Sequence, residues 1–211
     1  MKKKKVAKRY VNSLKKGNKT RKFEEVLLYI LDKVGSKVNI GEAVIYKLLY
    51  FIDFDYYEKF EEKLVGATYV KDDYGPTPVE FNKIVKSMLD KKDIVKVADE
   101  YFQYPQTKYL PLRKPDLGVL DANEKAVIDE VLNRLSDMDD LQISDYSHED
   151  VPWQTTEEGQ EINYRAVFYR TPAYSRRNYI DDENMPIGKM TRVKDFLPPP
   201  EKLKLPKKGK A

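Results

Sequence analysis

The chain has 211 residues, of which 41% are hydrophobic and 35% charged, with a net charge of +4 and no cysteine. The lack of cysteine excludes disulfides, zinc–thiolate sites and thiol catalysis. No run approaches the roughly 18 apolar residues of a transmembrane helix. No apolar stretch follows the basic N-terminus, so we expect a cytoplasmic protein without a secretory signal.

Charge is distributed unevenly along the chain. Residues 1–22 contain 11 Lys or Arg and no acidic residue, residues 23–200 contain 23 basic and 34 acidic residues, and residues 201–211 contain five Lys and one Glu. The sequence therefore combines an acidic body with two basic ends. A basic arm such as residues 1–22 could bind nucleic acid by neutralising phosphates, could act only as a solubilising tail, or could fold back onto the acidic body.

Two helices are predicted first. From Phe23, apolar residues recur at helical spacing and predict a helix that ends near Val34. A second helix is predicted from residues 39–40 to about Phe60, and it is apolar on several sides. Such a helix usually occupies the centre of a core.

An extended segment and a turn follow in "LVGATYVKDDYGPTPVEF". We then predict a helix start in which Thr77 is the cap, Pro78 lies in the first turn and Glu80 occupies the capping-box position. Residues 93–113 are rich in β-branched and aromatic residues and predict a β-hairpin or two short strands.

Three further helices are expected. Asp121 and Glu124 form a capping pair that starts a helix to about Ser136. Shorter helices should cover residues 141–147 and 161–169. The predicted fold class is mainly α (α+β). It comprises a basic N-terminal arm (1–22), one helical domain (23–170) with a small antiparallel β-hairpin or sheet, and an irregular, Pro/Lys-rich C-terminal extension (171–211).

The row Ser147-His148-Glu149 contains the only histidine and is the first candidate for catalysis. Adjacent side chains point about 100° apart on a helix and to opposite faces on a strand, so these three cannot form a triad among themselves. His148 could serve a distant serine, but no G-x-S-x-G motif occurs. We expect His148 to hold a helix end and Trp153, which follows Pro152, to pack back onto the body.

Metal and cofactor sites also lack support. One histidine and no cysteine leave carboxylates as ligands, and either Asp53 with Asp55 or Asp72 with Asp73 could bind magnesium weakly. The string from Pro115 to Lys125 lacks the ending of a common nuclease motif, and no glycine-rich phosphate loop is present. We therefore expect no catalytic residue, no metal and no cofactor.

The aromatic residues favour binding over catalysis. The chain has sixteen tyrosines and one tryptophan. Tyr50 and Phe51 are two of several closely spaced aromatic residues on the predicted second helix. Some of these rings should pack in the core, and others should reach the surface, where tyrosine is a favoured interface residue. The turn Tyr74-Gly75-Pro76 either directs the chain into the following helix or presents the Tyr74 ring at a binding surface.

Three blocks occur in a fixed order: "YKLLYFIDFDYYEKF", "GATYVKDDYGPTPVEFNKIV" and "LQISDYSHEDVPWQ". This arrangement, over about residues 45–169, resembles the Panacea domain of the SocA-like antitoxin family, which also occurs in phage-associated proteins. The matching positions are Lys47, Leu48, Leu49, Tyr50, Tyr74, Gly75, Pro76, Ser147, His148, Pro152 and Trp153. Tyr146 departs from the family pattern, which often has a small or apolar residue there.

The resemblance implies a mainly helical antitoxin that binds and neutralises a protein toxin encoded by the adjacent gene. It also implies that some relatives deliver the toxin to a cellular protease, and that no metal, cofactor or catalytic residue is involved. The candidate signature and interface residues are Lys47, Tyr50, Phe51, Tyr74, Gly75, Pro76, His148 and Trp153. The alternative is a nucleic-acid-binding regulator with a winged-helix-like body and the arm 1–22 on phosphate, and the two roles are compatible if the protein represses its own operon.

Overall fold

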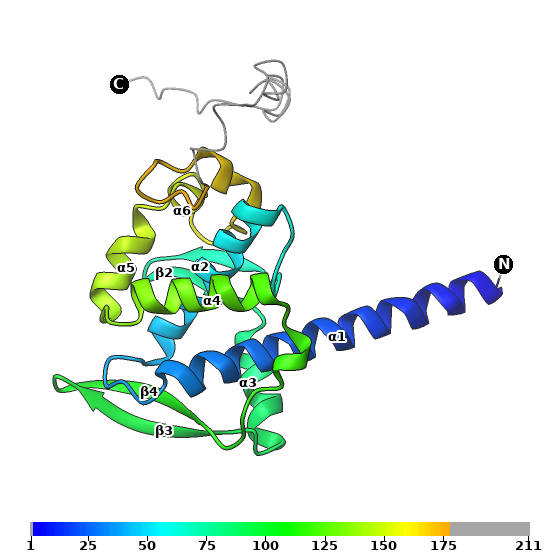
Figure 1. Cartoon of the computed structure of the whole chain (residues 1–211), viewed down its shortest axis with the longest axis horizontal. Coiled ribbons are helices and arrows are strands. Elements are labelled where there is room, and N and C mark those ends of the chain that lie inside the picture. The colour runs from blue at the N-terminus through cyan, green and yellow to red at the C-terminus, as the bar shows by residue number, and fades with distance from the viewer. Residues whose placement is uncertain (1, 178–211) are drawn as a thin grey trace, which may run out of the picture. The chain divides into compact units, whose positions relative to one another are not determined.

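The computed structural model describes the backbone of residues 2–177 and the side chains of residues 17–177 (Figure 1). The elements, with η for 3₁₀ helices, are α1 (Lys2–Val34), α2 (Glu42–Phe60), β1 (Tyr69–Asp72), β2 (Gly75–Pro78), α3 (Phe81–Asp90), β3 (Ile94–Tyr101), β4 (Tyr104–Pro111), η1 (Leu117–Val119), α4 (Ala122–Leu135), α5 (Asp140–His148), α6 (Val151–Gln154) and η2 (Tyr164–Tyr169). The predicted mainly α fold with a small antiparallel β component is confirmed.

Helix α2 occupies the centre of the core, as its apolar pattern predicts. It packs against α4, α5, β2, β4 and η2. Side chains on several of its faces are buried, among them Ile45, Leu49 and Phe54. Gly41 precedes the helix in an extended conformation, and Glu61 ends it in the left-handed region. Elements that are far apart in the sequence therefore meet on one helix.

Helix α1 is longer than the sequence predicts. It begins at Lys2 and so includes the basic arm in its backbone. Among its side chains from residue 17 onward, the buried ones start at Phe23, where the apolar periodicity begins, and they include Leu27 and Ile30. Packing against α3, α4 and β4 therefore involves its C-terminal part.

The β1–β2 hairpin replaces the predicted helix start at Thr77. Thr77 pairs with Val70 in an antiparallel ladder, so it belongs to β2 and does not cap a helix. The carboxylate of Glu80 accepts hydrogen bonds from the backbone N and the Oγ1 of Thr68, at 2.9 and 3.1 Å. Helix α3 begins only at Phe81. The prediction was wrong because Val70 of β1 pairs with Thr77, and Thr68, just before β1, bonds the Glu80 carboxylate, so neither group caps a helix.

Other local signals are confirmed. β3 and β4 form the predicted antiparallel hairpin, with Ile94 opposite Pro111 and Tyr101 opposite Tyr104. The capping box of Asp121 and Glu124 starts α4. A second capping box, Asp139 with Gln142, starts α5. Both helices are therefore fixed at their N-terminal ends by side chains close in sequence.

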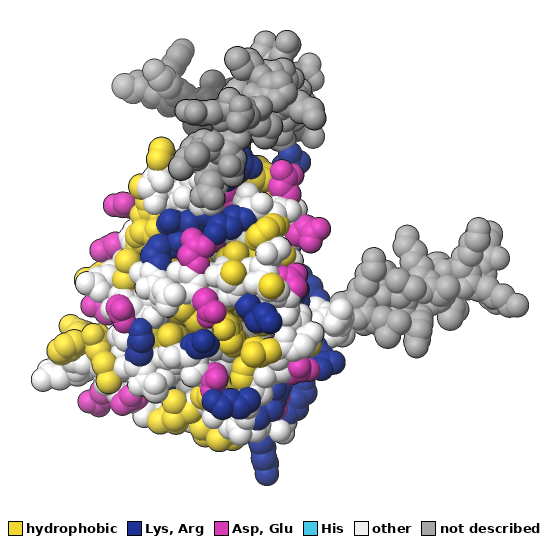
Figure 2. Space-filling view, viewed as in Figure 1, with side chains coloured by type: hydrophobic (Ala, Val, Ile, Leu, Met, Phe, Trp, Pro, Cys, Tyr) yellow, Lys and Arg dark blue, Asp and Glu magenta, His cyan; other side chains and the backbone are white. Residues whose placement is uncertain are grey.

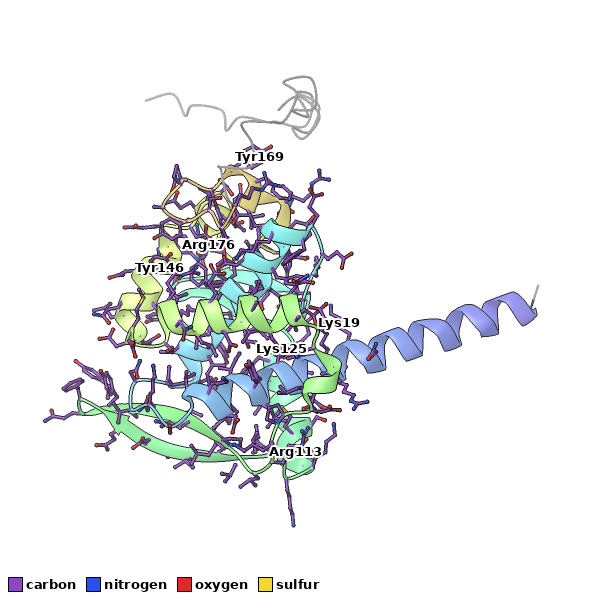
Figure 3. All side chains as sticks on the ribbon, in the orientation of Figure 1. Lys19, Arg113, Lys125, Tyr146, Tyr169 and Arg176 are labelled. Carbon is purple, nitrogen blue, oxygen red and sulfur yellow. The ribbon has the colours of Figure 1, made fainter. Side chains whose placement is uncertain are left out.

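The chain beyond α6 is less helical than predicted. The expected helix over residues 161–169 is reduced to η2, and Glu161 forms a β-bridge with Val70. Tyr174 and Ser175 are buried. Arg176 Nη2 donates to Tyr146 Oη at 3.2 Å, and Figure 3 shows the two side chains near each other. The compact unit ends at Arg176, and the rest of the predicted extension, from residue 178, lies outside the described residues.

Candidate functional site

The three sequence blocks meet in space around the turn that joins β1 to β2. We call Lys47 of α2, Gly75 of β2, Ser147 and His148 of α5, and Trp153 of α6 the signature cluster. Gly75 is its centre, because its Cα approaches side chains from both α2 and α5. The cluster therefore fixes the β1–β2 hairpin onto two helices.

Gly75 is required at its position for two reasons. Its φ is +105°, a conformation that L-residues rarely adopt. A Cβ at this position would lie 2.7 Å from Ser147 Oγ, 3.0 Å from Lys47 Cε and 3.8 Å from His148 Nε2. The turn thus has a structural role, which is to bring the hairpin backbone directly against the helices.

Ser147 and Ser144 connect α5 to the same turn. Ser147 is fully buried and its Oγ donates to the carbonyl oxygen of Ser144 at 2.8 Å. The Oγ of Ser144 donates to the carbonyl oxygen of Tyr74 at 3.2 Å. Ser147 therefore serves packing, and as a buried hydroxyl with an intrahelical partner it is not positioned as a nucleophile.

His148 and Trp153 stack on one another. Their ring centroids are 4.2 Å apart with an interplanar angle of 20°, and Lys71 Nζ lies 3.8 Å from the centroid of the tryptophan ring. Neither His148 Nε2 nor Trp153 Nε1 has a hydrogen-bond partner in the described part of the chain, although both atoms are buried. Burial lowers the pKa of His148, so the neutral ring is favoured near pH 7. His148 is the last residue of α5, and its ring stacks on Trp153.

Lys47 is the charged member of the cluster. Its side chain is buried, and its Nζ lies 3.5 Å from Asp140 Oδ1 at the start of α5. Burial lowers the pKa of Lys47, and the carboxylate of Asp140 opposes that shift. The lysine therefore links α2 to the N-terminal end of α5 from beneath the hairpin.

Asp53, which the sequence offers as a magnesium ligand, is hydrogen-bonded to groups of the protein itself. Its carboxylate is fully buried and accepts hydrogen bonds from the backbone N–H groups of residues 65–67 and from the hydroxyls of Tyr69 and Tyr164. Burial raises the pKa of Asp53, and the hydrogen bonds oppose the shift. This carboxylate holds the loop after α2.

Asp55 belongs to a buried ion cluster around Arg170. Arg170 Nη1 lies 2.7 Å from Asp55 Oδ1 and 2.9 Å from Glu58 Oε2, and its Nη2 lies 2.6 Å from Asp150 Oδ2. Arg134 Nη2 also reaches Asp55, at 2.7 Å. Burial alone would lower the pKa of Arg170, but the carboxylates of Asp150 and Asp55 outweigh it and raise that pKa.

The acidic residues considered as magnesium ligands are not gathered into one group. Within residues 17–177, no group of three or more His, Asp or Glu side chains is arranged to hold a metal ion. Asp72 and Asp73 are exposed at the tip of the β1–β2 hairpin. The ion cluster was missed by sequence reasoning because its members are spread from α2 to the segment after η2.

Only one candidate residue is mostly exposed. Tyr50, Phe51 and Pro76 are buried with Lys47 and Gly75 in the interior, and His148 and Trp153 are half-buried. Tyr50 Oη donates to Asp150 Oδ2 at 2.9 Å, and the Phe51 ring lies 5.2 Å from that of Tyr146. Tyr74 is 76% exposed. The described structure therefore separates seven supporting positions from one that faces outward.

A second exposed side chain lies near Tyr74. Leu141 is 72% exposed and sits one helical turn before Ser144, whose hydroxyl contacts the Tyr74 backbone. The acidic residues Asp72, Asp73 and Asp140 are exposed around them. We call these five residues the Tyr74 face. Sequence reasoning missed Leu141, because an apolar residue in a predicted helix is normally assigned to the core.

The chain belongs to the family described as antitoxin SocA-like, Panacea domain, whose model matches residues 45–154, just over half of the chain. The predicted family is thereby confirmed, and all eight candidate residues lie inside the match. Arg170 lies outside it. No curated protein matches the chain. None of the helices in the described residues is long and apolar enough to cross a membrane.

Proposed function

We propose that the protein is an antitoxin that neutralises a protein toxin encoded by the adjacent gene through direct contact, and that it acts by binding alone. The observation that carries this proposal is the difference in exposure among the eight candidate residues of the signature blocks. Seven buried or half-buried positions pack beneath the exposed Tyr74. The family's antitoxin character supports the same role.

We place the toxin contact at the Tyr74 face. Tyrosine and leucine offer large apolar area, and the tyrosine hydroxyl can also hydrogen-bond, which suits the centre of an interface. Three exposed carboxylates surround them, so the complementary partner surface is basic. A toxin that acts on RNA would carry such a surface, and opposite charges would speed its encounter with the antitoxin.

The contacts of the buried polar groups support the proposal that the protein binds without catalysing a reaction. Asp53 is hydrogen-bonded to the backbone and to tyrosines, Asp55 is paired with arginines, and Ser147 is buried. A catalytic group must reach its substrate. The same side chains in these arrangements serve to hold the fold.

Co-expression with the neighbouring open reading frame tests the proposal. The neighbour should stop growth alone and should be harmless beside this protein. Tyr74→Ala should lose neutralisation and keep the unfolding midpoint, whereas Tyr169→Ala, a control at an exposed position of η2, should keep both. A harmless neighbour, or undiminished toxicity beside the wild-type protein, would contradict the antitoxin role. Full neutralisation by Tyr74→Ala would contradict the assigned surface.

The toxin level in the same cells distinguishes two modes of neutralisation. A constant amount of inactive toxin indicates steric masking. A falling amount that recovers when cellular proteases are removed indicates delivery for degradation, the route that the family resemblance suggests. Either outcome requires direct binding.

Nucleic-acid binding is the second candidate. The observation that favours it is the arm 1–22, with 11 Lys or Arg and no acid, whose backbone from Lys2 is part of α1. Phosphate contacts by such a helix would weaken steeply with salt. Gel shifts with operator DNA at several salt concentrations, with and without residues 1–22, test the idea, and a lack of salt-dependent binding by the full chain would refute it.

A further inference from the structure

The outer edge of β3 is unpaired in the described part of the chain. β3 pairs with β4 on one side, and no second strand joins it on the other. Residues 95–100 are exposed along nearly the whole strand. Unpaired N–H and C=O groups on such an edge are a template for another strand. Figure 1 shows the hairpin extending from the base of the body.

The tip of this hairpin has an unusual turn. Phe102 and Gln103 both have positive φ, at 46° and 69°, the arrangement of a type I′ turn that normally uses Asn and Gly. Phe102 is 79% exposed and Tyr104 is 76% exposed. The Phe102 ring packs edge-on against the Tyr101 ring, with centroids 4.6 Å apart, and most of its surface stays exposed. Turn geometry disfavours a bulky side chain here, so a further contact by the exposed part of the ring would help to account for it.

The base of the hairpin is also apolar and accessible. Val95 and Leu110 lie opposite each other, and both are exposed. Leu112, just after β4, is exposed as well. Figure 2 shows hydrophobic side chains at the hairpin tip and along its lower edge. Between tip and base, β3 carries Lys96, Asp99 and Glu100.

We propose that β3 pairs antiparallel with β3 of a second copy of this chain, with Ala98 on the two-fold axis. The two hairpins then form one four-stranded antiparallel sheet. In this register Lys96 of each copy lies opposite Glu100 of the other, twice in the dimer. Opposite charges directly across a ladder stabilise it, and neither side chain has an ion pair in residues 17–177.

The neighbouring symmetric registers are worse. Centring on Val97 places Lys96 opposite Ala98 and forms no ion pair. Centring on Asp99 places that carboxylate opposite its own copy, and like charges across a ladder are destabilising. The charge pattern of β3 therefore selects the Ala98 register.

The same register explains the apolar ends of the hairpin. Val95 lies opposite Tyr101 of the second copy. Phe102 comes level with Ile94, which is itself buried but directly precedes the exposed Val95 at the hairpin base. Each exposed tip is thereby brought to the other copy's accessible base, as an isologous interface requires. One arrangement therefore pairs the free edge of β3, places opposite charges across the ladder and brings the apolar tip of each hairpin to the apolar base of the other.

Charge exchange tests the register on the full-length protein by sedimentation and light scattering. Lys96→Glu or Glu100→Lys alone places like charges at both contacts and should raise the dimer dissociation constant by about tenfold. The double variant should restore the wild-type value. Lys86→Glu, at an exposed position of α3, is the matched control and should change nothing. A monomeric wild type, unaffected single variants or an unrestored double variant would each overturn the proposal.

Cross-linking gives an independent readout because the chain has no cysteine. Residues opposite one another in an antiparallel pair have Cα atoms about 4.5–5.5 Å apart, within the range of a disulfide. Ala98→Cys should therefore form a covalent dimer on mild oxidation. Glu100→Cys should not, since its two copies would be about 13 Å apart along the strands. Equal cross-linking of both variants would refute the register. Neither measurement involves the toxin, so failure here leaves the proposed function untouched.

Discussion

Replacement of Gly75 by alanine should be one of the most damaging single-methyl changes in this chain. The backbone φ of +105° is costly for an L-residue, by about 1–3 kcal/mol. The new Cβ would also lie 2.7 Å from Ser147 Oγ and 3.0 Å from Lys47 Cε, two atoms of buried side chains. Overpacking of this kind costs about 1–3 kcal/mol. We expect a total loss of about 3 kcal/mol in the free energy of unfolding.

Gly159→Ala is the matched control for this change. Gly159 has φ +72°, but a Cβ there would meet nothing within 4 Å. It should show the backbone cost alone, about 1 kcal/mol. Urea denaturation followed by circular dichroism gives both values from the shift in midpoint.

A double variant isolates the steric part. Gly75→Ala with Ser147→Ala removes the closest atom, so it should be more stable than the sum of the single effects by about 1 kcal/mol. The backbone cost and the Lys47 contact should remain. Equal destabilisation by Gly75→Ala and Gly159→Ala, or strict additivity with Ser147→Ala, would show that the hairpin is not held against α5 as described.

Three other changes probe the buried polar groups, each by the same denaturation assay. Arg170→Met should cost about 3–5 kcal/mol, because three buried carboxylates lose their common partner, and an unchanged midpoint would contradict the ion cluster. Asp53→Asn should cost about 2–4 kcal/mol, since its amide would face donors that now bind a carboxylate; a neutral effect would refute that role. Burial lowers the pKa of His148 in the folded state, so as pH falls below about 6.5 the unfolded chain binds a proton before the folded chain does, and the free energy of unfolding decreases. His148→Phe, which keeps an aromatic ring against Trp153, should remove this contribution to the pH dependence of stability.

Features that depend on neighbours in sequence could be predicted. The capping box of Asp121 and Glu124 needs only residues three apart, and it forms as predicted. The β3–β4 hairpin follows from the β-branched and aromatic residues of its segment, and the central position of α2 follows from its apolar faces. In the site, Gly75 and His148 could be singled out from their residue types and their order along the chain.

Features that depend on distant partners could not. The Thr77–Glu80 pattern fits a capping box, and only the pairing of Thr77 with Val70 and the contact of Glu80 with Thr68 decide against it. Arg170 stands in an unremarkable stretch, yet its carboxylate partners lie 20 to 115 residues away. Charge pairing at such separations leaves no periodic signal in a sequence.

Tyr74 and Gly75 are neighbours in the chain but are under different evolutionary constraints. Gly75 cannot change without disturbing two helices, whereas Tyr74 is held through its carbonyl oxygen, a group that every residue has. Substitution at position 74 can therefore alter the outward chemistry of the domain while leaving its folding free energy nearly constant. With Tyr74 as the proposed partner contact, the domain would acquire new binding partners by drift at a single codon, without first passing through unstable intermediates.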